Sequence, residues 1–256
     1  MEYAWSAIDL VAMNFLTACN PPASTSQAII LRMKNTTIIQ SVAATLTLSA
    51  ACAAQAGRPL VVDDANTNDK GAGHVEVWVA RDAGKATSVF IAPAYAPIDN
   101  VELSAVLARD TTNHLSAQAL QVKWRITPSQ EKGCNFATVL GITHASGGGS
   151  NPFYLNGNAS CNGLGPVSVH ANIGFTKASG SSAIKTWGIA AEMPLGSVTS
   201  HIEAFGAEGA KPTLQLGART QITKTIQLDG TIGRSSGETI YSVGLKFQFG
   251  WPDIMR

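Results

Sequence analysis

The stretch TIYSVGLKFQF, residues 239–249, decides the fold. Side chains of a β-strand alternate between its two faces. One face of this strand therefore receives only apolar side chains, those of Tyr241, Val243, Leu245, Phe247 and Phe249. The other face receives small or polar residues, namely Ser242, Gly244, Lys246 and Gln248. The alternation recurs along the chain without an intervening helical segment and follows a secretion signal, which favours a transmembrane β-barrel that is apolar outside and polar inside.

The composition agrees with a single exported barrel. The chain has 256 residues, 24 of them glycine, with 14% charged residues and a net charge of +1. Binding to nucleic acid is not expected, because a phosphate-binding surface needs a clear basic excess. No apolar run approaches the roughly 20 residues that a membrane-spanning helix needs.

Strand-like segments follow one another from residue 75 to the end of the quoted stretch. They cover residues 75–79, 88–95, 101–107, 120–126, 136–143, 153–159, 167–175, 187–193, 201–205, 214–218, 226–232 and 239–249. We therefore expect an all-β fold, a single antiparallel transmembrane barrel of about 12 strands, an even number as in bacterial barrels. If the mature chain begins and ends in the periplasm, the short connections 97–100, 194–197 and 223–225 all lie on that side.

A targeting segment precedes the barrel. Residues 33–56 begin with Met33-Lys34, continue through an Ala/Leu/Val/Thr-rich stretch and end at Ala54-Gln55-Ala56, which is typical of a signal-peptide helix and its cleavage site. Residues 1–32 lack a basic start and are interpreted as an over-extended N-terminus. The remaining boundaries are an irregular N-terminal segment at 57–73, a barrel at 74–251 and a tail at 252–256.

Two cysteines remain after cleavage, Cys134 and Cys161. A pair of cysteines in an exported protein is a disulfide candidate. The expected strands place Cys134 in the connection after the fourth strand and Cys161 in the connection after the sixth. Both connections fall on the periplasmic side.

The mature chain resembles a family of bacterial outer-membrane barrels described as putative phenol-degradation meta-pathway proteins. The resemblance is carried by RPLVVDD at 58–64, GHVE at 73–76, PIDNVEL at 97–103 and the closing YSVGLKFQF at 241–249. It implies an outer-membrane location and uptake of small or apolar compounds, and it implies no catalytic residues. The chain departs from the usual pattern by continuing to Arg256 after the last aromatic residue, which could weaken recognition by the barrel-insertion machinery.

The polar faces of the strands carry both charge signs. The candidates for lumen-facing residues are Glu76, Glu102, Lys123, Arg125, His170, Glu192, Glu203, Arg219, Asp229 and Lys246. A barrel of about 12 strands is narrower than an open porin of about 16 strands. Two interpretations are open: a structural network of ion pairs that fills the lumen, and a narrow polar conduit or ligand cavity. Mixed signs argue against strong selectivity for anions or cations.

Enzymatic and metal chemistry find little support. His144 and Ser146 are two residues apart, but Ser146 begins a glycine-rich loop and no acid follows until Glu192. A nucleophile needs a base held within hydrogen-bond reach and a third group that orients the base. The histidines are scattered without metal-ligand spacing. Asp63-Asp64 lacks the spacing of a calcium loop and is expected to be a solvated turn. We therefore expect no enzyme activity, no metal and no cofactor.

Three functions are open at this point. The first is an outer-membrane barrel for passive passage or binding of small molecules, apolar or aromatic ones among them. The second is a structural outer-membrane barrel without transport. The third is a soluble periplasmic β-sandwich or lipocalin-like binder, which would reverse the two faces of every strand. The expected partners are outer-membrane lipid, the barrel-insertion machinery and a small solute.

Overall fold

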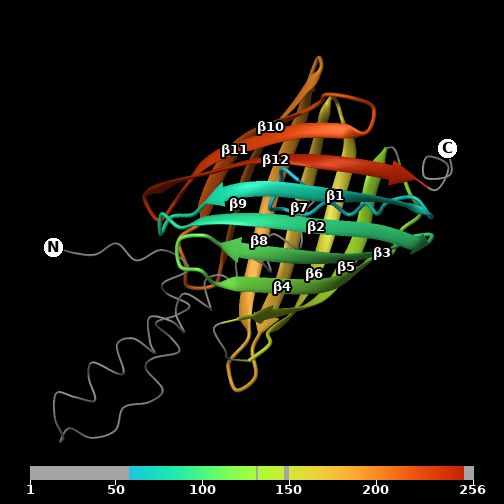
Figure 1. Cartoon of the computed structure of the whole chain (residues 1–256). Helices are drawn as coiled ribbons and strands as arrows, with labels where there is room; N and C mark the ends of the chain where they lie inside the picture. Colours follow the sequence, from blue (N-terminus) through green and yellow to red (C-terminus); the bar gives the residue numbers. More distant parts are fainter. Residues whose placement is uncertain (1–57, 131, 147–149, 251–256) are drawn as a thin grey trace, which may run out of the picture.

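The computed structural model describes residues 58–130, 132–146 and 150–250, and these form a closed antiparallel β-barrel (Figure 1). Its twelve strands follow the chain order around the barrel, and β1 closes against β12. They are β1 Ala72–Arg81, β2 Thr87–Ile98, β3 Val101–Asp110, β4 Ser116–Arg125, β5 Gly133–Ala145, β6 Phe153–Leu164, β7 Val167–Lys177, β8 Ile184–Leu195, β9 Val198–Ala207, β10 Thr213–Gln221, β11 Ile226–Ser235 and β12 Glu238–Gly250. The predicted all-β barrel of about 12 strands is confirmed.

Three predicted segments lie outside the described residues: the over-extended N-terminus 1–32, the signal-peptide helix 33–56 and the tail 252–256. Among the residues that are described, no helix is long and apolar enough to cross a membrane.

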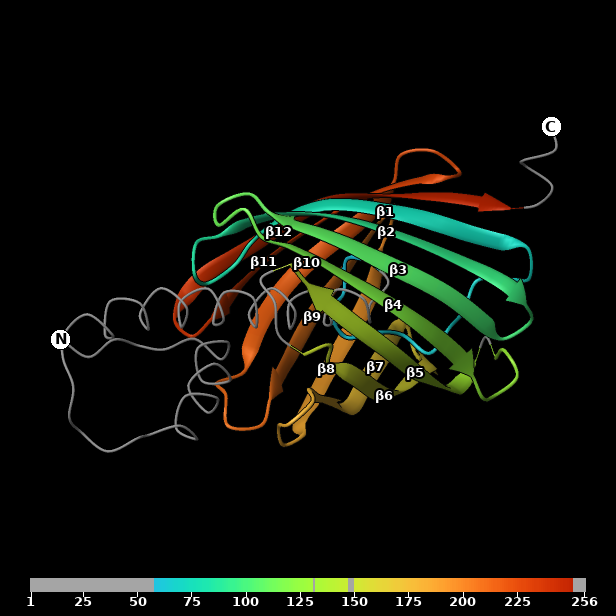
Figure 2. The same ribbon diagram turned by 60° about the horizontal axis from the view of Figure 1, so that its bottom comes forward.

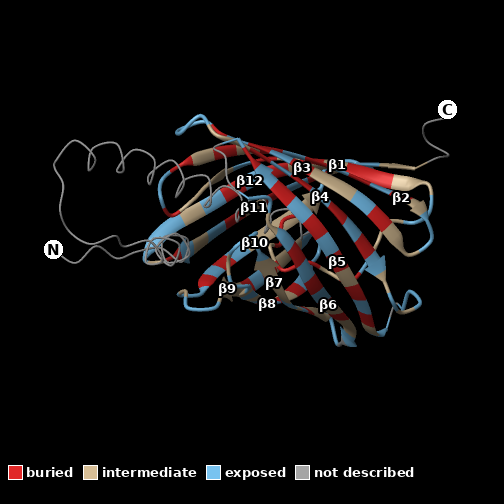
Figure 3. Cartoon of the chain, turned by 90° about the horizontal axis from the view of Figure 1, so that it is seen from below, coloured by how far each residue is buried: buried red, intermediate tan, exposed pale blue. Residues whose placement is uncertain are grey.

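The two faces of each strand are segregated as the alternation predicts. On β12, Val243 is 60% exposed on the outer wall, while Ser242 beside it points inward and is 9% exposed. The banding of buried and exposed residues repeats along the strands (Figure 3). Large apolar side chains such as Leu120, Ile173 and Ile232 are exposed on the outside. The inside holds buried polar side chains together with an apolar cluster that includes Trp78 and Phe90, whose rings stack at 4.6 Å. This arrangement inverts that of a soluble protein, which rarely exposes large contiguous apolar surface.

The barrel has two distinct ends. We call the end where β1 begins and β12 ends the terminal end, and the opposite end the loop end. The connections at the terminal end include the two-residue turns 99–100, 165–166 and 196–197. The short connections that the sequence places on one side therefore do lie at one end.

The cysteines lie within strands rather than in connections. Cys134 is on β5 and Cys161 is directly opposite it on β6, and a disulfide joins them with a Cα–Cα distance of 4.0 Å. The expected placement in two turns was wrong, because β5 and β6 extend further toward the terminal end than their weak alternation indicates.

The N-terminal segment is inside the barrel. Residues 58–70, here called the inner segment, precede β1 and run through the lumen (Figure 2). Leu60 and Val62 pack there against Ala190 of β8 and Phe205 of β9. The segment is irregular, as expected, but it is an internal part of the barrel and not an exposed leader.

Candidate functional site in the barrel lumen

The first anchor of the inner segment is Arg58. Its guanidinium forms a buried ion pair with Asp229 of β11, in which Nε donates to Oδ1 at 2.9 Å. Nη2 also donates to Ser242 Oγ at 3.2 Å, and the guanidinium lies over the Trp78 ring at 5.0 Å from its centroid. The backbone N–H of Arg58 donates to Glu76 Oε1 at 3.1 Å. One residue thus connects the inner segment to β1, β11 and β12.

The second anchor is the carboxylate of Glu203 on β9. Its Oε2 accepts the backbone N–H groups of Val61 at 2.9 Å and Val62 at 2.8 Å. Gln215 Nε2 donates to Oε1 at 2.6 Å. Glu203 is 1% exposed, so its carboxylate is shielded from water. The three donors supply the hydrogen bonds that water would otherwise provide.

The third anchor is Asp63, which is fully buried. Lys123 Nζ of β4 donates to Asp63 Oδ1 at 2.7 Å, and Asn158 Nδ2 of β6 donates to Oδ2 at 2.9 Å. The backbone N–H of Asp63 donates to Asn172 Oδ1 of β7 at 2.7 Å. The expectation of a solvated turn at Asp63-Asp64 was wrong, because the segment enters the lumen and Asp63 meets an ammonium group there.

Further contacts extend the network toward β3 and β8. Asn68 donates to Glu102 Oε2 from its backbone at 2.9 Å and from Nδ2 at 2.8 Å. Ala65 N–H donates to Ser160 Oγ at 2.7 Å, and Ser160 bonds His170 Nδ1 at 2.8 Å. The next link is Glu192, which lies 3.4 Å from His170 Nε2 and forms an ion pair with Arg219 at 2.8 Å.

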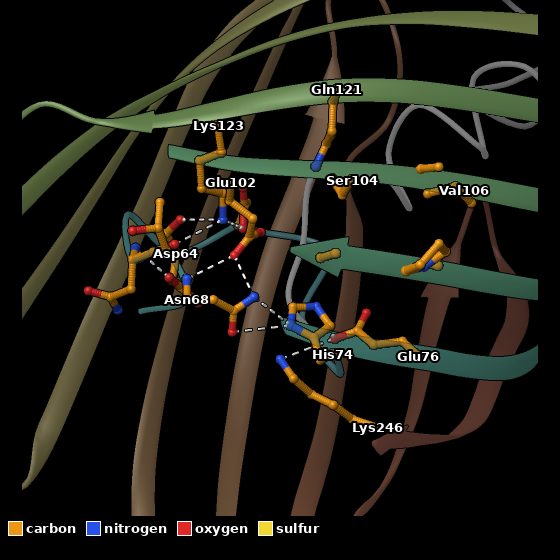
Figure 4. Close-up of a pocket in the computed structure, with 17 residues that line it drawn as sticks. Asp64, Asn68, His74, Glu76, Glu102, Ser104, Val106, Gln121, Lys123 and Lys246 are labelled. Atoms are coloured by element: carbon orange, nitrogen blue, oxygen red, sulfur yellow. Dashed lines mark hydrogen bonds and ion pairs between the residues drawn. The ribbon is translucent and has the colours of Figure 1, made fainter. Parts of the chain in front are cut away.

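A polar cavity of about 150 Å³ remains between the inner segment and strands β1 to β4 (Figure 4). Both charge signs face it. Lys246 Nζ lies 3.3 Å from Glu76 Oε1 at one side, and Lys123 and Glu102 lie at the other. Asp64, Asn68, His74, Ser104 and Gln121 complete its polar lining. A cavity of this size and lining suits water and small polar molecules.

The predicted lumen residues divide into three groups in the structure. Those that contact the inner segment directly are Glu76, Glu102, Lys123, Glu203 and Asp229. His170, Glu192 and Arg219 form the adjoining chain, and Lys246 pairs with Glu76. Arg125 stands apart at the terminal end, where its Nη2 donates to Asn100 Oδ1 at 2.6 Å.

The sequence analysis missed the main participant, which is the inner segment itself. A signal was present: the apolar run Leu60-Val61-Val62 is flanked by Arg58 and by Asp63-Asp64. An apolar run of this kind is unusual in an exposed leader and is explained by contact with the wall at β8 and β9.

The catalytic and metal sites considered from the sequence are not supported by the arrangement of the side chains. His144 Nδ1 bonds Asn151 Oδ1 at 2.7 Å, while Ser146 Oγ accepts the Ser116 N–H, so no hydrogen bond links His144 to Ser146. Within the described parts of the chain, no group of three histidine, cysteine, aspartate or glutamate side chains could hold a metal ion.

Comparison with known proteins identifies the family. A model of the family described as "Uncharacterised conserved protein UCP029691" matches residues 43–242. The chain belongs to this family. No curated protein sequence matches the chain.

Solved structures show the same fold at low sequence identity. The KdgM porin in complex with disordered oligogalacturonate is 12% identical, with a TM-score of 0.59 over 70% of this chain and 99% of that one. The NanC porin is 9% identical, with a TM-score of 0.54 over 69% of this chain and 100% of that one. The barrel therefore has the fold of these porins. The expected phenol-pathway family finds no support in these matches.

Proposed function

We propose that the protein is an outer-membrane barrel that admits or binds small polar solutes in a lumen narrowed by its own inner segment. The observation that carries this proposal is the closed barrel with an apolar outer wall and a charged lumen. Strands that are apolar outward and polar inward are suited to lipid outside and water inside. The fold shared with porins supports the same reading.

The lumen favours polar solutes over the apolar or aromatic ones considered from the sequence. Its open cavity is lined by four charged residues, Lys123, Lys246, Glu76 and Glu102, and by smaller apolar residues such as Ala92, Ala94 and Val106. The large aromatic side chains of the lumen, Trp78 and Phe90, are stacked on each other at 4.6 Å. An apolar solute would displace water from these charged groups without replacing its hydrogen bonds, which is unfavourable. Mixed charges suit neutral hydroxylated or zwitterionic solutes.

A structural barrel without transport is the second candidate. The observation that favours it is the inner segment, whose anchors reach β1, β3, β4, β6, β7, β9 and β11. With this segment in place, the described residues leave a cavity of about 150 Å³ beside β1 to β4, which holds only small molecules.

Solute uptake by liposomes separates the two candidates. The full protein and a form that begins at Asp69 would be reconstituted, and swelling would be followed with glycine, glycerol, a disaccharide and benzoate. We expect the full protein to pass the smallest polar solutes and the shortened form to pass the disaccharide as well. If neither form passes any solute although both are folded and inserted, the structural role is correct instead. Recovery of the native protein in a periplasmic wash would overturn both.

A further inference from the structure

The outer wall carries its charges at one end only. Apart from Glu238, which is exposed at the loop end of β12, every aspartate and glutamate in the described strands occupies an inward position of the alternation, whereas five cations occupy outward positions. All five lie within two residues of the loop end of their strands, and they are Arg81 of β1, Arg109 of β3, Lys177 of β7, Lys185 of β8 and Arg234 of β11.

The terminal end of the wall is different. Its outward positions carry large apolar side chains, including Ile98 at 55% exposure, Trp124 at 54% and Leu195 at 54%. Among the described strand residues, no cation takes an outward position there. The wall is thus asymmetric along the barrel axis, with positive charge confined to the loop end.

Three of the cations form a continuous belt, here called the arginine belt: Arg234, Arg81 and Arg109. Arg234 is paired in register with Thr239 of β12, and Tyr241 two residues further on is paired with Arg81. Arg81 is paired with Thr87 of β2, and Val89 is paired with Arg109 of β3. The belt therefore crosses five neighbouring strands on one side of the barrel.

The guanidinium groups of the belt keep donors for an external ligand. None of the three arginines forms an ion pair with a described residue. Arg109 Nη1 donates to Ser116 Oγ at 2.9 Å, and Arg234 Nη2 donates to the carbonyl of Gly237. By contrast, Lys185 lies 3.7 Å from Glu208 and is partly neutralised.

A hollow of about 530 Å³ in the wall adjoins Arg109. Its apolar part is formed by Val89, Ile91 and Leu107, and polar groups of Arg109, Gln118 and His144 stand beside them. The hollow combines the apolar side chains of Ile91 and Leu107 with the Arg109 guanidinium nearer the loop end. This combination matches a lipid, with an acyl chain along Ile91 and Leu107 and an anionic headgroup at Arg109.

We propose that the arginine belt and this hollow bind a phosphorylated glycolipid of the membrane leaflet at the loop end. Guanidinium groups bind phosphate oxygens in bidentate geometry, and basic side chains at the membrane surface attract anionic headgroups. Two exposed acids lie at the same end, Glu238 and Glu208, but neither forms an ion pair with an arginine of the belt. The inference rests on the proposed function, which places the barrel in the outer membrane, and it assigns a lipid ligand to the outer wall.

The test is a lipid titration of the purified full protein in a neutral detergent, followed by native mass spectrometry. The probes are lipid A with two phosphates and the same lipid after removal of the phosphates. The belt variant is R81Q/R109Q/R234Q. The matched control is K70Q/K132Q/K224Q, which removes three positive charges from exposed positions near the terminal end.

We expect the wild-type protein to prefer the phosphorylated lipid and the belt variant to bind it at least about tenfold more weakly, while the control is unchanged. Heat-modified migration in gels shows whether each variant is folded, and single substitutions replace the triple variant if it is not. Equal affinity of the belt variant and the control overturns the inference. A protein that inserts and passes solutes but does not distinguish the two lipids overturns this inference alone and leaves the proposed function standing.

Discussion

The bond between Glu203 and the inner segment offers a direct test of how the lumen is kept narrow. Glu203→Ala removes the acceptor of the Val61 and Val62 N–H groups at 2.9 and 2.8 Å. A hydrogen bond to a charged group contributes about 1.5–3 kcal/mol, so the two bonds together contribute about 3–6 kcal/mol. The ion pairs of Arg58 and Asp63 remain, so we expect local release of the segment rather than its full departure.

The assay measures how often Val62 becomes accessible. In a Val62→Cys background the new thiol replaces a side chain that is 1% exposed, and Cys134 and Cys161 do not compete because they are bonded to each other. A membrane-impermeant maleimide labels the thiol only when the segment opens. We expect Glu203→Ala to raise the labelling rate by at least about tenfold. The increase should stay below the factor that corresponds to about 3–6 kcal/mol, because the other anchors still hold the segment.

The control is Glu208→Ala, which removes an exposed carboxylate at the loop end, 57% exposed and paired only with Lys185. This variant should label at the parent rate. Equal labelling rates for Glu203→Ala and Glu208→Ala would refute the argument that the Glu203 carboxylate holds the segment in the lumen.

Three further predictions concern the wall. Leu245→Arg places a charge on the lipid face of β12 and should reduce folding into bilayers by about 2–4 kcal/mol, whereas Leu245→Ile should fold normally in the same denaturant titration. Cys134→Ser opens a disulfide with a sequence separation of 27, for which chain entropy alone gives a loss of about 3–4 kcal/mol; an unchanged unfolding temperature on gels would contradict this. Gly141→Ala should destabilise the barrel, because a Cβ there would lie 2.2 Å from Tyr154 Cζ, and Gly141→Ala with Tyr154→Leu should recover part of the loss.

The wall of the barrel was predictable because it depends on a local property. Alternation along a strand such as β12 states which residues meet lipid and which meet the lumen, without knowledge of any partner strand. The strand count and the end at which each turn lies follow from the same pattern. Strand ends were less accurate, and the weak alternation of β5 placed Cys134 in a turn when it belongs to a strand.

The inner segment was not predictable in the same way. Its contacts join residues far apart in the sequence, such as Asp63 with Asn172 and Arg58 with Asp229, and these positions meet only when the barrel has closed. The segment has no periodicity because the lumen surrounds it on all sides with different partners. The lumen candidates could be named from the polar face of each strand, but their true partners could not.

The arginine belt explains why overall charge is a poor guide to the partners of this chain. A net charge of +1 indicates that the chain as a whole is not strongly basic. Within the described strands, however, most acids lie inside the barrel, where Glu76 pairs with Lys246, Glu192 with Arg219 and Asp229 with Arg58 of the inner segment. The outward arginines of the belt form no ion pair with a described acid. Charge that cancels in composition is therefore largely separated in space by strand parity, and the outward positions of the strands carry an excess of positive charge.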